Sequence, residues 1–194
     1  SSQFFHPPRT HKMAEQTAAL ETQPSLDDIH FGEIDWSQFP DTKRRILIPV
    51  DGSHNCDRAL HWYVENMKKE HDFIIMVHVI APNFTYKLHG ENHQLVPETD
   101  IKGKLETYSK AGQELKERYL KWSQDHQVTS KVLLYVSSHP GETIVRVAKS
   151  LPTDQILMGN RGLGTIRRAF LGSVTDYVLH HAHKPLIVVP PPEK

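Results

Sequence analysis

The sequence contains a single cysteine, Cys56, and no net charge, since 23 basic and 23 acidic side chains balance. One cysteine cannot form an internal disulfide, and such usage is typical of a reducing compartment. Balanced charge provides no overall field that would attract nucleic acid or an anionic membrane surface. No apolar run approaches the roughly 20 residues of a membrane-spanning helix, and no signal peptide is recognisable. We therefore expect a soluble, cytoplasmic protein that binds neither nucleic acid nor membrane.

The first 42 residues show no sustained hydrophobic period and contain many polar residues and prolines. Between residues 21 and 41, acidic side chains accumulate with no lysine or arginine among them. Such a stretch buries too little apolar area to offset the entropy lost on ordering it. We predict a flexible N-terminal extension over residues 1–42, whose end Trp36 and Phe39 can pin onto a domain that occupies residues 43–194.

Short apolar runs alternate with helical patterns along the rest of the chain. The runs, which we predict to be strands, cover residues 46–50, 73–80, 128–136, 155–159 and 185–190. Apolar residues recur at helical spacing in four segments: after Ser53, in the segment that leads up to Trp122, after a turn at His139-Pro140-Gly141, and over residues 173–183. This alternation is typical of parallel sheets with right-handed crossovers. The sequence therefore predicts an α/β fold, an open five-stranded parallel sheet with helices on both faces.

Two of the predicted strand ends carry distinctive turns. Pro49 suits the end of the first strand, where its missing N–H interrupts no ladder. Val50-Asp51-Gly52-Ser53 follows, with Ser53 positioned to cap the next helix. The fourth strand runs into Met158-Gly159-Asn160-Arg161-Gly162. Ligands of open α/β sheets bind beyond the carboxyl ends of the strands, where strand order reverses. These two turns are therefore the candidate ligand site.

The second turn belongs to a longer glycine-rich segment, which begins with Gly159-x2-Gly162 and ends in Gly172-Ser173-Val174-Thr175 at a helix start. Glycines allow the main chain to approach a ligand closely, and successive amides beside a helix N-terminus form an anion site. The hydroxyls of Ser173 and Thr175 can donate to phosphate oxygens, and Arg161 adds positive charge. The segment is therefore a candidate phosphate-binding loop.

The same residues also allow a purely structural interpretation, in which the segment binds no ligand. The glycines can serve tight connections only, and Ser173-x-x-Asp176 satisfies the capping-box pattern. The segment is not a P-loop, because it lacks Gly-Lys-Ser/Thr, and it does not follow the first strand as a Rossmann fingerprint would. On these grounds alone phosphate binding is only slightly favoured.

Four motifs in order resemble the universal stress protein family. Gly159-x2-Gly162-x9-Gly172-Ser173 is similar to the family's ATP-binding signature, G-2x-G-9x-G-(S/T). The other three are Pro49-Val50-Asp51-Gly52-Ser53, His78-Val79-Ile80 and Pro185-Leu186-Ile187-Val188-Val189, and the resemblance covers roughly residues 43–191. The resemblance implies a Rossmann-like fold of the adenine nucleotide alpha hydrolase type, with strand order 3-2-1-4-5.

The resemblance also implies a ligand, ATP, ADP or AMP, and the residues that hold it. The main chain of Val79 would recognise the adenine edge, and Pro49 and Val50 would line the base pocket. Asp51 would hold the ribose or lie near a Mg²⁺ ion bound to the triphosphate. The residues implied around the ribose and phosphates are Met158, Gly159, Gly162, Gly172, Ser173, Val174 and Thr175, with Arg161 as electrostatic help. A homodimer through strand 185–190 is implied as well.

We therefore expect an adenine-nucleotide-binding stress or signalling protein whose conformation or choice of partner responds to the nucleotide. The alternatives are a slow ATPase that uses the same site and an interaction module that binds no nucleotide. No recognisable catalytic pair accompanies Asp51, which favours binding over hydrolysis. We expect no metal site built from side chains, because His180, His181 and His183 lack the spacing that aims two ligands together. Cys56 is expected to be an ordinary small residue.

Overall fold

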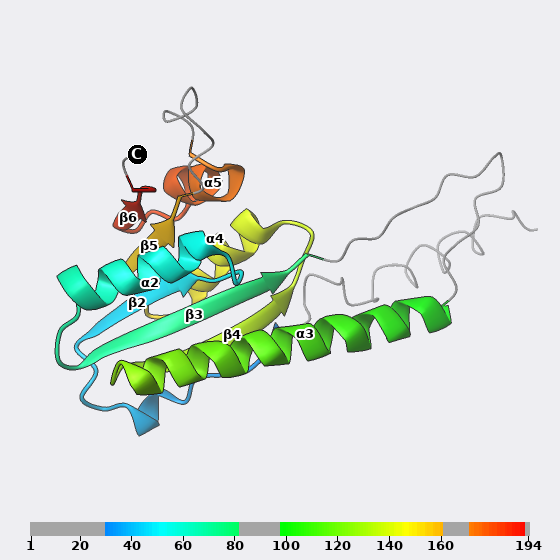
Figure 1. Ribbon diagram of the computed structural model, residues 1–194, viewed down its shortest axis with the longest axis horizontal. Coiled ribbons are helices and arrows are strands. Elements are labelled where there is room, and N and C mark those ends of the chain that lie inside the picture. Colours follow the sequence, from blue (N-terminus) through cyan, green and yellow to red (C-terminus); the bar gives the residue numbers. More distant parts are fainter. Residues whose placement is uncertain (1–29, 82–97, 161–170, 193–194) are drawn as a thin grey trace, which may run out of the picture.

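The computed structural model describes residues 30–81, 98–160 and 171–192. The sheet contains five parallel strands, namely β2 (Arg44–Pro49), β3 (Asp72–Ile80), β4 (Thr129–Val136), β5 (Gln155–Gly159) and β6 (Leu186–Val189). Their order across the sheet is β4-β3-β2-β5-β6 (Figure 1). The predicted fold class and the strand order 3-2-1-4-5 are therefore confirmed.

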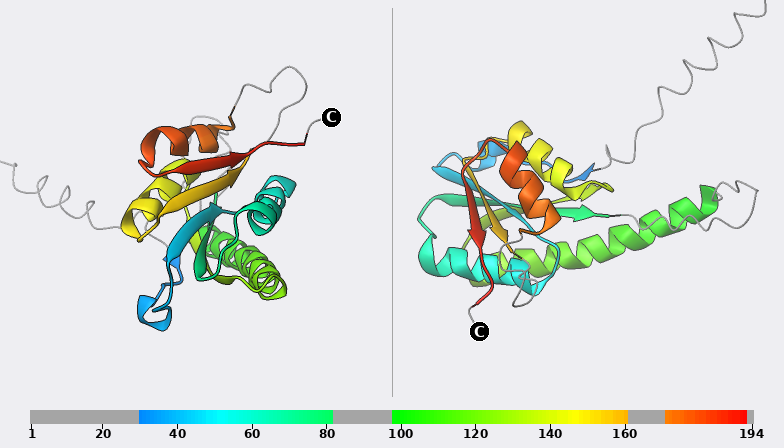
Figure 2. Two further views of the ribbon diagram at one scale, coloured as in Figure 1. Left: turned by 90° about the vertical axis from the view of Figure 1, so that its left-hand side faces the viewer. Right: turned by 90° about the horizontal axis from the view of Figure 1, so that it is seen from above.

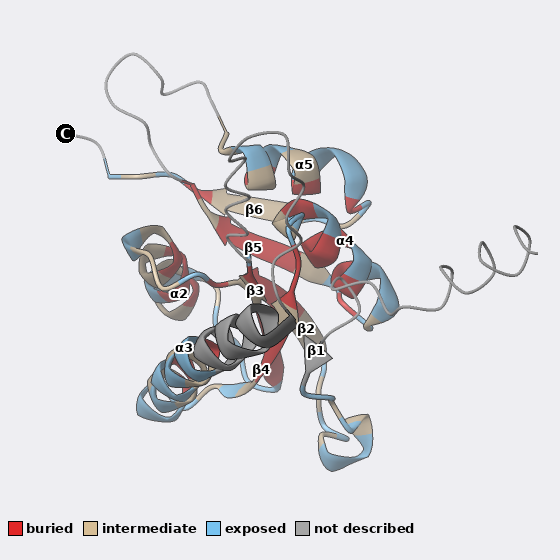
Figure 3. Ribbon diagram, turned by 90° about the vertical axis from the view of Figure 1, so that its right-hand side faces the viewer, coloured by how far each residue is buried: buried red, intermediate tan, exposed pale blue. Residues whose placement is uncertain are grey.

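Two pairs of helices cover the sheet. One face is covered by α2 (His54–Asn66) and α3 (Glu98–Asp125), and the other by α4 (Pro140–Ser150) and α5 (Ser173–His181), as Figure 2 shows. The apolar core accordingly has two halves. Alternate residues of β2 point into each, so that Ile46 and Ile48 pack with α2 and α3 while Leu47 packs with α4 and α5. Apolar runs of this kind are buried on both faces (Figure 3).

The chain before residue 43 contributes a sixth, antiparallel strand that the sequence analysis does not predict. β1 (His30–Phe31) pairs with β4 at the sheet edge. A short 3-10 turn, η2 (Trp36–Gln38), follows. The rings of Trp36 and Phe39 lie 5.1 Å and 4.7 Å from the ring of Phe73. Both residues thus pack on the domain, and ordered structure begins ahead of residue 43, because apolar rings there offset the entropy of ordering a short polar segment.

Two helix starts differ from expectation. The turn predicted at residues 139–141 is wrong, because Pro140 and Gly141 form the first turn of α4. Proline is favoured at this position, where its missing N–H needs no partner. Ser53 precedes α2 as expected, but its side chain makes no capping bond. Its main-chain N–H instead donates to Asp51 Oδ1 at 2.9 Å.

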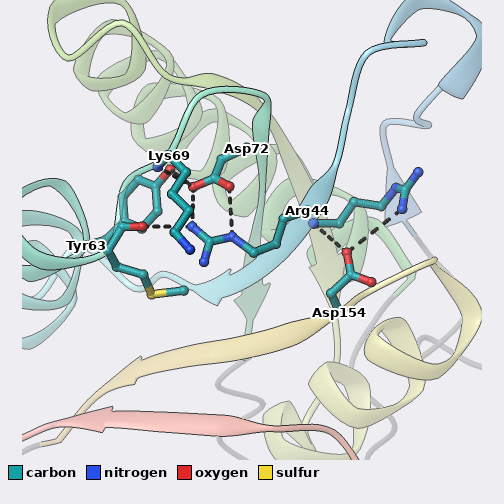
Figure 4. A network of polar contacts seen from close by, with 7 residues as sticks. Arg44, Tyr63, Lys69, Asp72 and Asp154 are labelled. Atoms are coloured by element: carbon teal, nitrogen blue, oxygen red, sulfur yellow. Dashed lines mark hydrogen bonds and ion pairs between the residues drawn. The ribbon is translucent and has the colours of Figure 1, made fainter.

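A charged cluster joins β2, β3 and α2 at the amino ends of the strands. Arg44 donates through Nε and Nη2 to the two carboxylate oxygens of Asp72, at 2.8 Å and 2.6 Å, as Figure 4 shows. The Tyr63 hydroxyl and the Lys69 main-chain N–H donate to the same carboxylate, each at 2.9 Å. Burial alone would raise the pKa of Asp72, but these bonds outweigh it and the pKa is lowered. The Arg44–Asp72 pair lies at the amino ends of the strands, whereas the candidate site lies at their carboxyl ends.

Candidate functional site

The candidate site lies at the carboxyl ends of β2, β3 and β5. Because β2 pairs with both β3 and β5, the turn after β2, the end of β3 and the end of β5 are neighbours. The start of α5 joins them, since the Gly172 N–H donates to Asn160 Oδ1 at 3.4 Å. Arg161 and Gly162 lie outside the described residues. The other predicted site residues lie in these segments: Pro49, Val50 and Asp51 at the end of β2 and in the turn after it, Val79 near the end of β3, Met158 and Gly159 at the end of β5, and Gly172, Ser173, Val174 and Thr175 at the start of α5.

The turn after β2 is held in a defined shape. Gly52 has φ +78°, a conformation that side chains disfavour, and its N–H donates to the Tyr119 hydroxyl of α3 at 3.1 Å. The exposed carboxylate of Asp51 accepts the Ser53 N–H and, at 2.9 Å, the thiol of Cys56. Burial and the adjacent Asp51 carboxylate raise the pKa of Cys56 to about 12. Cys56 is therefore a neutral thiol that orients Asp51, a role beyond that of an ordinary small residue.

The end of β3 presents main-chain groups to this turn. Val50 N–H donates to the Val77 carbonyl at 2.8 Å, which is the last rung between the two segments. The side chain of His78 then contacts the Val50 carbonyl oxygen through Nδ1, also at 2.8 Å. Burial lowers the pKa of His78 despite this bond and the nearby Asp51 carboxylate. Val79 follows, half-buried, at the carboxyl end of the strand.

The end of β5 lies tightly against α2. A Cβ at Gly159 would overlap the main-chain carbonyl of Asn55, so a glycine is required there by packing alone. At Gly172, by contrast, a Cβ would meet no described residue within 4 Å, and φ is an ordinary −60°. The first glycine of the motif therefore serves helix–strand contact, whereas no described residue fills the space beside Gly172.

Two residues at this edge were missed by the sequence analysis. Asn160 is 9% exposed, and it links β5 to β6 through its N–H and to α5 through its side chain. Arg58 of α2 donates from Nη2 to the main-chain carbonyls of Asn160 and Val189, the ends of β5 and β6. The Asn160 side chain follows a buried strand, which is the one signal that could have indicated it. These two carbonyls lie more than a hundred residues from Arg58, so local pattern could not reveal the contacts.

The start of α5 differs from the capping-box reading. Gly172 is the N-cap and Ser173 is the first helical residue, so Ser173 does not cap the helix. Ser173 is exposed, while Thr175 is 5% exposed. The first N–H groups of a helix have no partner within the helix, and with the positive dipole character of this end they suit an anion. Of the two hydroxyls considered above, that of Ser173 is the one exposed at this end.

Further features of the described residues bear on other classes of site. No group of three or more His, Cys, Asp or Glu side chains among them is placed to hold a metal ion. No helix in the described part of the chain is long and apolar enough to cross a bilayer. A hollow of about 570 Å³ runs along α4 between Ser137 and Tyr177, and none of the predicted site residues lines it.

The open parallel sheet, with helices on both faces and the strand order β4-β3-β2-β5-β6, defines a Rossmann-like α/β domain. The sequence model of the universal stress protein family matches residues 43–190, and the chain belongs to this family. Universal stress protein MJ0577 of Methanocaldococcus jannaschii is 28% identical over 156 residues, covering 75% of this chain and 94% of that protein. A universal stress protein of Mycolicibacterium smegmatis is 27% identical over 148 residues, but the chain spans only 48% of its length.

Solved structures resemble the same region. The hypothetical protein PH0823 superposes with a TM-score of 0.58 at 26% identity, covering 78% of this chain and 98% of that one. A universal stress protein family protein from Arabidopsis thaliana, with AMP bound, superposes with a TM-score of 0.55 at 18% identity. That alignment covers 76% of this chain and 92% of the Arabidopsis chain. It supports the likeness of fold alone.

Proposed function

We propose that this universal stress protein binds an adenine nucleotide, ATP, ADP or AMP, at the carboxyl edge formed by β2, β3 and β5. The observation that carries the proposal is the open start of α5. There the space beside Gly172 and the first helical N–H groups lie at the strand ends where α/β sheets bind ligands. The AMP in the Arabidopsis structure of the same fold supports the choice of ligand class.

In this proposal each predicted residue has a distinct task. The main chain of Val79 reads the adenine edge, Pro49 and Val50 contact the base, and the Asp51 carboxylate holds the ribose. Mg²⁺, when it accompanies a triphosphate, would supply positive charge to the phosphates, and the Asp51 carboxylate could face it. The residues assigned to surround the ribose and phosphates are Met158, Gly159, Gly162, Gly172, Ser173, Val174 and Thr175, with Arg161 adding charge.

The physiological role that we propose is stress response or signalling through nucleotide-dependent conformation or partner binding. A homodimer is part of the proposal, because β6 is an edge strand of the sheet. Its residues Leu186, Ile187 and Val188 are only half-buried, and such an edge can pair with a second copy of the chain. Sedimentation velocity tests it, with Val188→Asp expected to give monomers. A wild-type protein that sediments as a monomer would remove the dimer from the proposal. Action in the cytoplasm stays a prediction.

Thermal unfolding with and without nucleotide tests binding directly. A ligand at about 100 times its dissociation constant stabilises the native state by about 2.7 kcal/mol, so AMP or ATP should raise the unfolding temperature. Gly172→Val places a side chain in the open space beside α5 and should remove the shift while leaving the unliganded protein folded. Glu65→Ala, on the exposed side of α2, is the control and should respond as the wild type does. A wild-type protein that no adenine nucleotide stabilises would contradict the proposed function.

A further inference from the structure

His78 occupies a hydrogen-bonding position that a β-ladder normally gives to the main chain. Val50 N–H donates to the Val77 carbonyl, so the next rung of a parallel ladder would join the Val79 N–H to the Val50 carbonyl. Within the described residues no main-chain bond of this kind is formed. The Val50 carbonyl instead contacts Nδ1 of His78, at 2.8 Å. The His78 imidazole therefore replaces the Val79 N–H as the partner of the Val50 carbonyl.

The direction of the main-chain groups follows from the same ladder. The Val77 carbonyl faces β2, and the Ile80 carbonyl faces the other way, where it accepts the Ser137 N–H at 3.0 Å beyond the end of β4. Groups on a strand alternate in this way, so the N–H and carbonyl of Val79 face the β2 side, like those of Val77. Because β2 ends at Pro49, the Val79 groups face the candidate site and no longer face a strand.

The chemistry of the contact also assigns a tautomer. A main-chain carbonyl only accepts hydrogen bonds, so Nδ1 must carry the proton. Burial favours the neutral ring, in which Nε2 is then an acceptor. The side chain of His78 lies on the α2 and α3 face, with Ile74 and Met76, while that of Val79 packs toward α4 and α5. His78 thus holds the turn after β2 through its side chain, while the main chain of its neighbour Val79 faces the candidate site.

We propose that His78 is a positioning residue of this site: its Nδ1–H occupies the Val50 carbonyl and so leaves the Val79 N–H for the adenine base. The proposal rests on the proposed function and adds a residue to it. By the same bond, the Pro49–Asp51 segment is aligned with the Val79 edge, so the base contacts and the ribose contacts share one anchor. His78 acts through Val50 and Val79, without touching the nucleotide.

Two substitutions separate this role from general packing. Asn places its side-chain N–H close to where Nδ1 lies in histidine, so His78→Asn should keep the bond to Val50. His78→Leu fills similar space but has no donor, so the Val50 carbonyl should pair with the Val79 N–H and withdraw it from the ligand. Loss of one hydrogen bond to the base weakens binding by about tenfold. We expect AMP and ATP to be weakened equally in His78→Leu, because the phosphate contacts are unchanged, and His78→Asn to stay within about threefold of wild type.

Calorimetric titration with AMP and ATP, together with amide exchange of Val79 by NMR, tests the proposal. In the unliganded protein, the Val79 amide should exchange faster in wild type and His78→Asn than in His78→Leu, and AMP should slow it in wild type. If His78→Leu bound AMP and ATP as tightly as the wild type does, the role of His78 would be overturned and the proposed function would stand. A wild-type protein that binds neither nucleotide would overturn both.

A measurement on the wild type alone covers the case in which a variant does not fold. A long-range ¹H–¹⁵N spectrum of the histidine rings should show His78 with a protonated Nδ1 and an unprotonated Nε2. The opposite tautomer, or a Val79 amide already strongly protected without ligand, would contradict the inference whatever the variants do.

Discussion

Gly159, the last residue of β5, lies directly against the main-chain carbonyl of Asn55 in the first turn of α2. A methyl group on residue 159 would overlap this carbonyl, and backbone atoms cannot move aside as the end of a flexible side chain can. The glycine pattern that points to a phosphate site thus begins with a residue whose identity packing already requires. Its later member, Gly172, is under no such constraint from the described residues.

We predict that Gly159→Ala destabilises the protein and Gly172→Ala does not. Overpacking against a backbone atom costs about 1–3 kcal/mol or more. At Gly172 the added methyl group would meet no described residue and φ is ordinary, so the change should stay within about 0.5 kcal/mol. Urea unfolding of both variants measures the difference. Equal stabilities for the two variants would show that α2 moves away from β5 at little cost.

A second prediction concerns acid stability and the Arg44–Asp72 pair. Because folding lowers the pKa of Asp72, its stabilising contribution is complete above the ordinary aspartate value of 3.8 and disappears as the pH falls through the lower pKa of the folded protein. Asp72→Asn leaves the Arg44 charge without its partner. The side chain of Arg44 is 24% exposed, so we expect a loss of about 2–3 kcal/mol at neutral pH, below the ~3–5 kcal/mol of a fully buried pair.

The control for Asp72 is Asp154, which is about half exposed and accepts the Arg45 N–H at 2.7 Å. Asp154→Asn should cost at most about 1 kcal/mol, because the amide oxygen can still accept the Arg45 N–H and only an exposed ion pair with Arg45 is lost. Unfolding free energies measured across the acid range should fall less steeply with decreasing pH in Asp72→Asn than in wild type. An unchanged pH slope in that variant would mean that Asp72 does not carry the acid sensitivity.

Much of the fold could be predicted from sequence, because apolar runs buried on both faces leave a strong local signal. The five parallel strands begin and end within two residues of the predicted limits. β1 was missed because two residues at a sheet edge leave no periodic pattern. The order of the strands came from resemblance to a family, since local spacing does not determine which strands pair.

The candidate site was less predictable than the fold. Its glycines and the Asp51 turn are visible as motifs, but Arg58, His78 and Asn160 act through bonds to main-chain carbonyls or amides distant in sequence. Such bonds need no particular spacing, and any polar residue near a strand end could make them. Cys56 was assigned no role for the same reason, because its contact with Asp51 depends on the exact course of the turn.

A third prediction concerns the segment before residue 43. Trp36 packs on Phe73, and the Arg45 guanidinium lies over the Trp36 ring, 5.3 Å from the ring centroid. We expect Trp36→Ala to destabilise the protein by about 1–2 kcal/mol through lost aromatic and cation–π contact. Glu33→Ala, exposed in the same segment, should change stability by less than about 0.5 kcal/mol. Thermal unfolding that cannot distinguish the two variants would mean that this segment adds nothing to stability.

The last prediction concerns the chemical reactivity of Cys56. Burial and the neighbouring Asp51 carboxylate raise the thiol pKa to about 12, so the thiolate that reacts with alkylating reagents is scarce at mildly alkaline pH. Alkylation of the folded protein by iodoacetamide should therefore be much slower than that of the unfolded chain. Asp51→Asn removes the negative charge and should speed the reaction about tenfold for each unit by which the pKa falls. Intact-protein mass spectrometry follows the rate, and Cys56→Ser should show no adduct. If Asp51→Asn reacted no faster than wild type, limited access to the buried sulfur would govern the reaction, and the carboxylate would have no part in it.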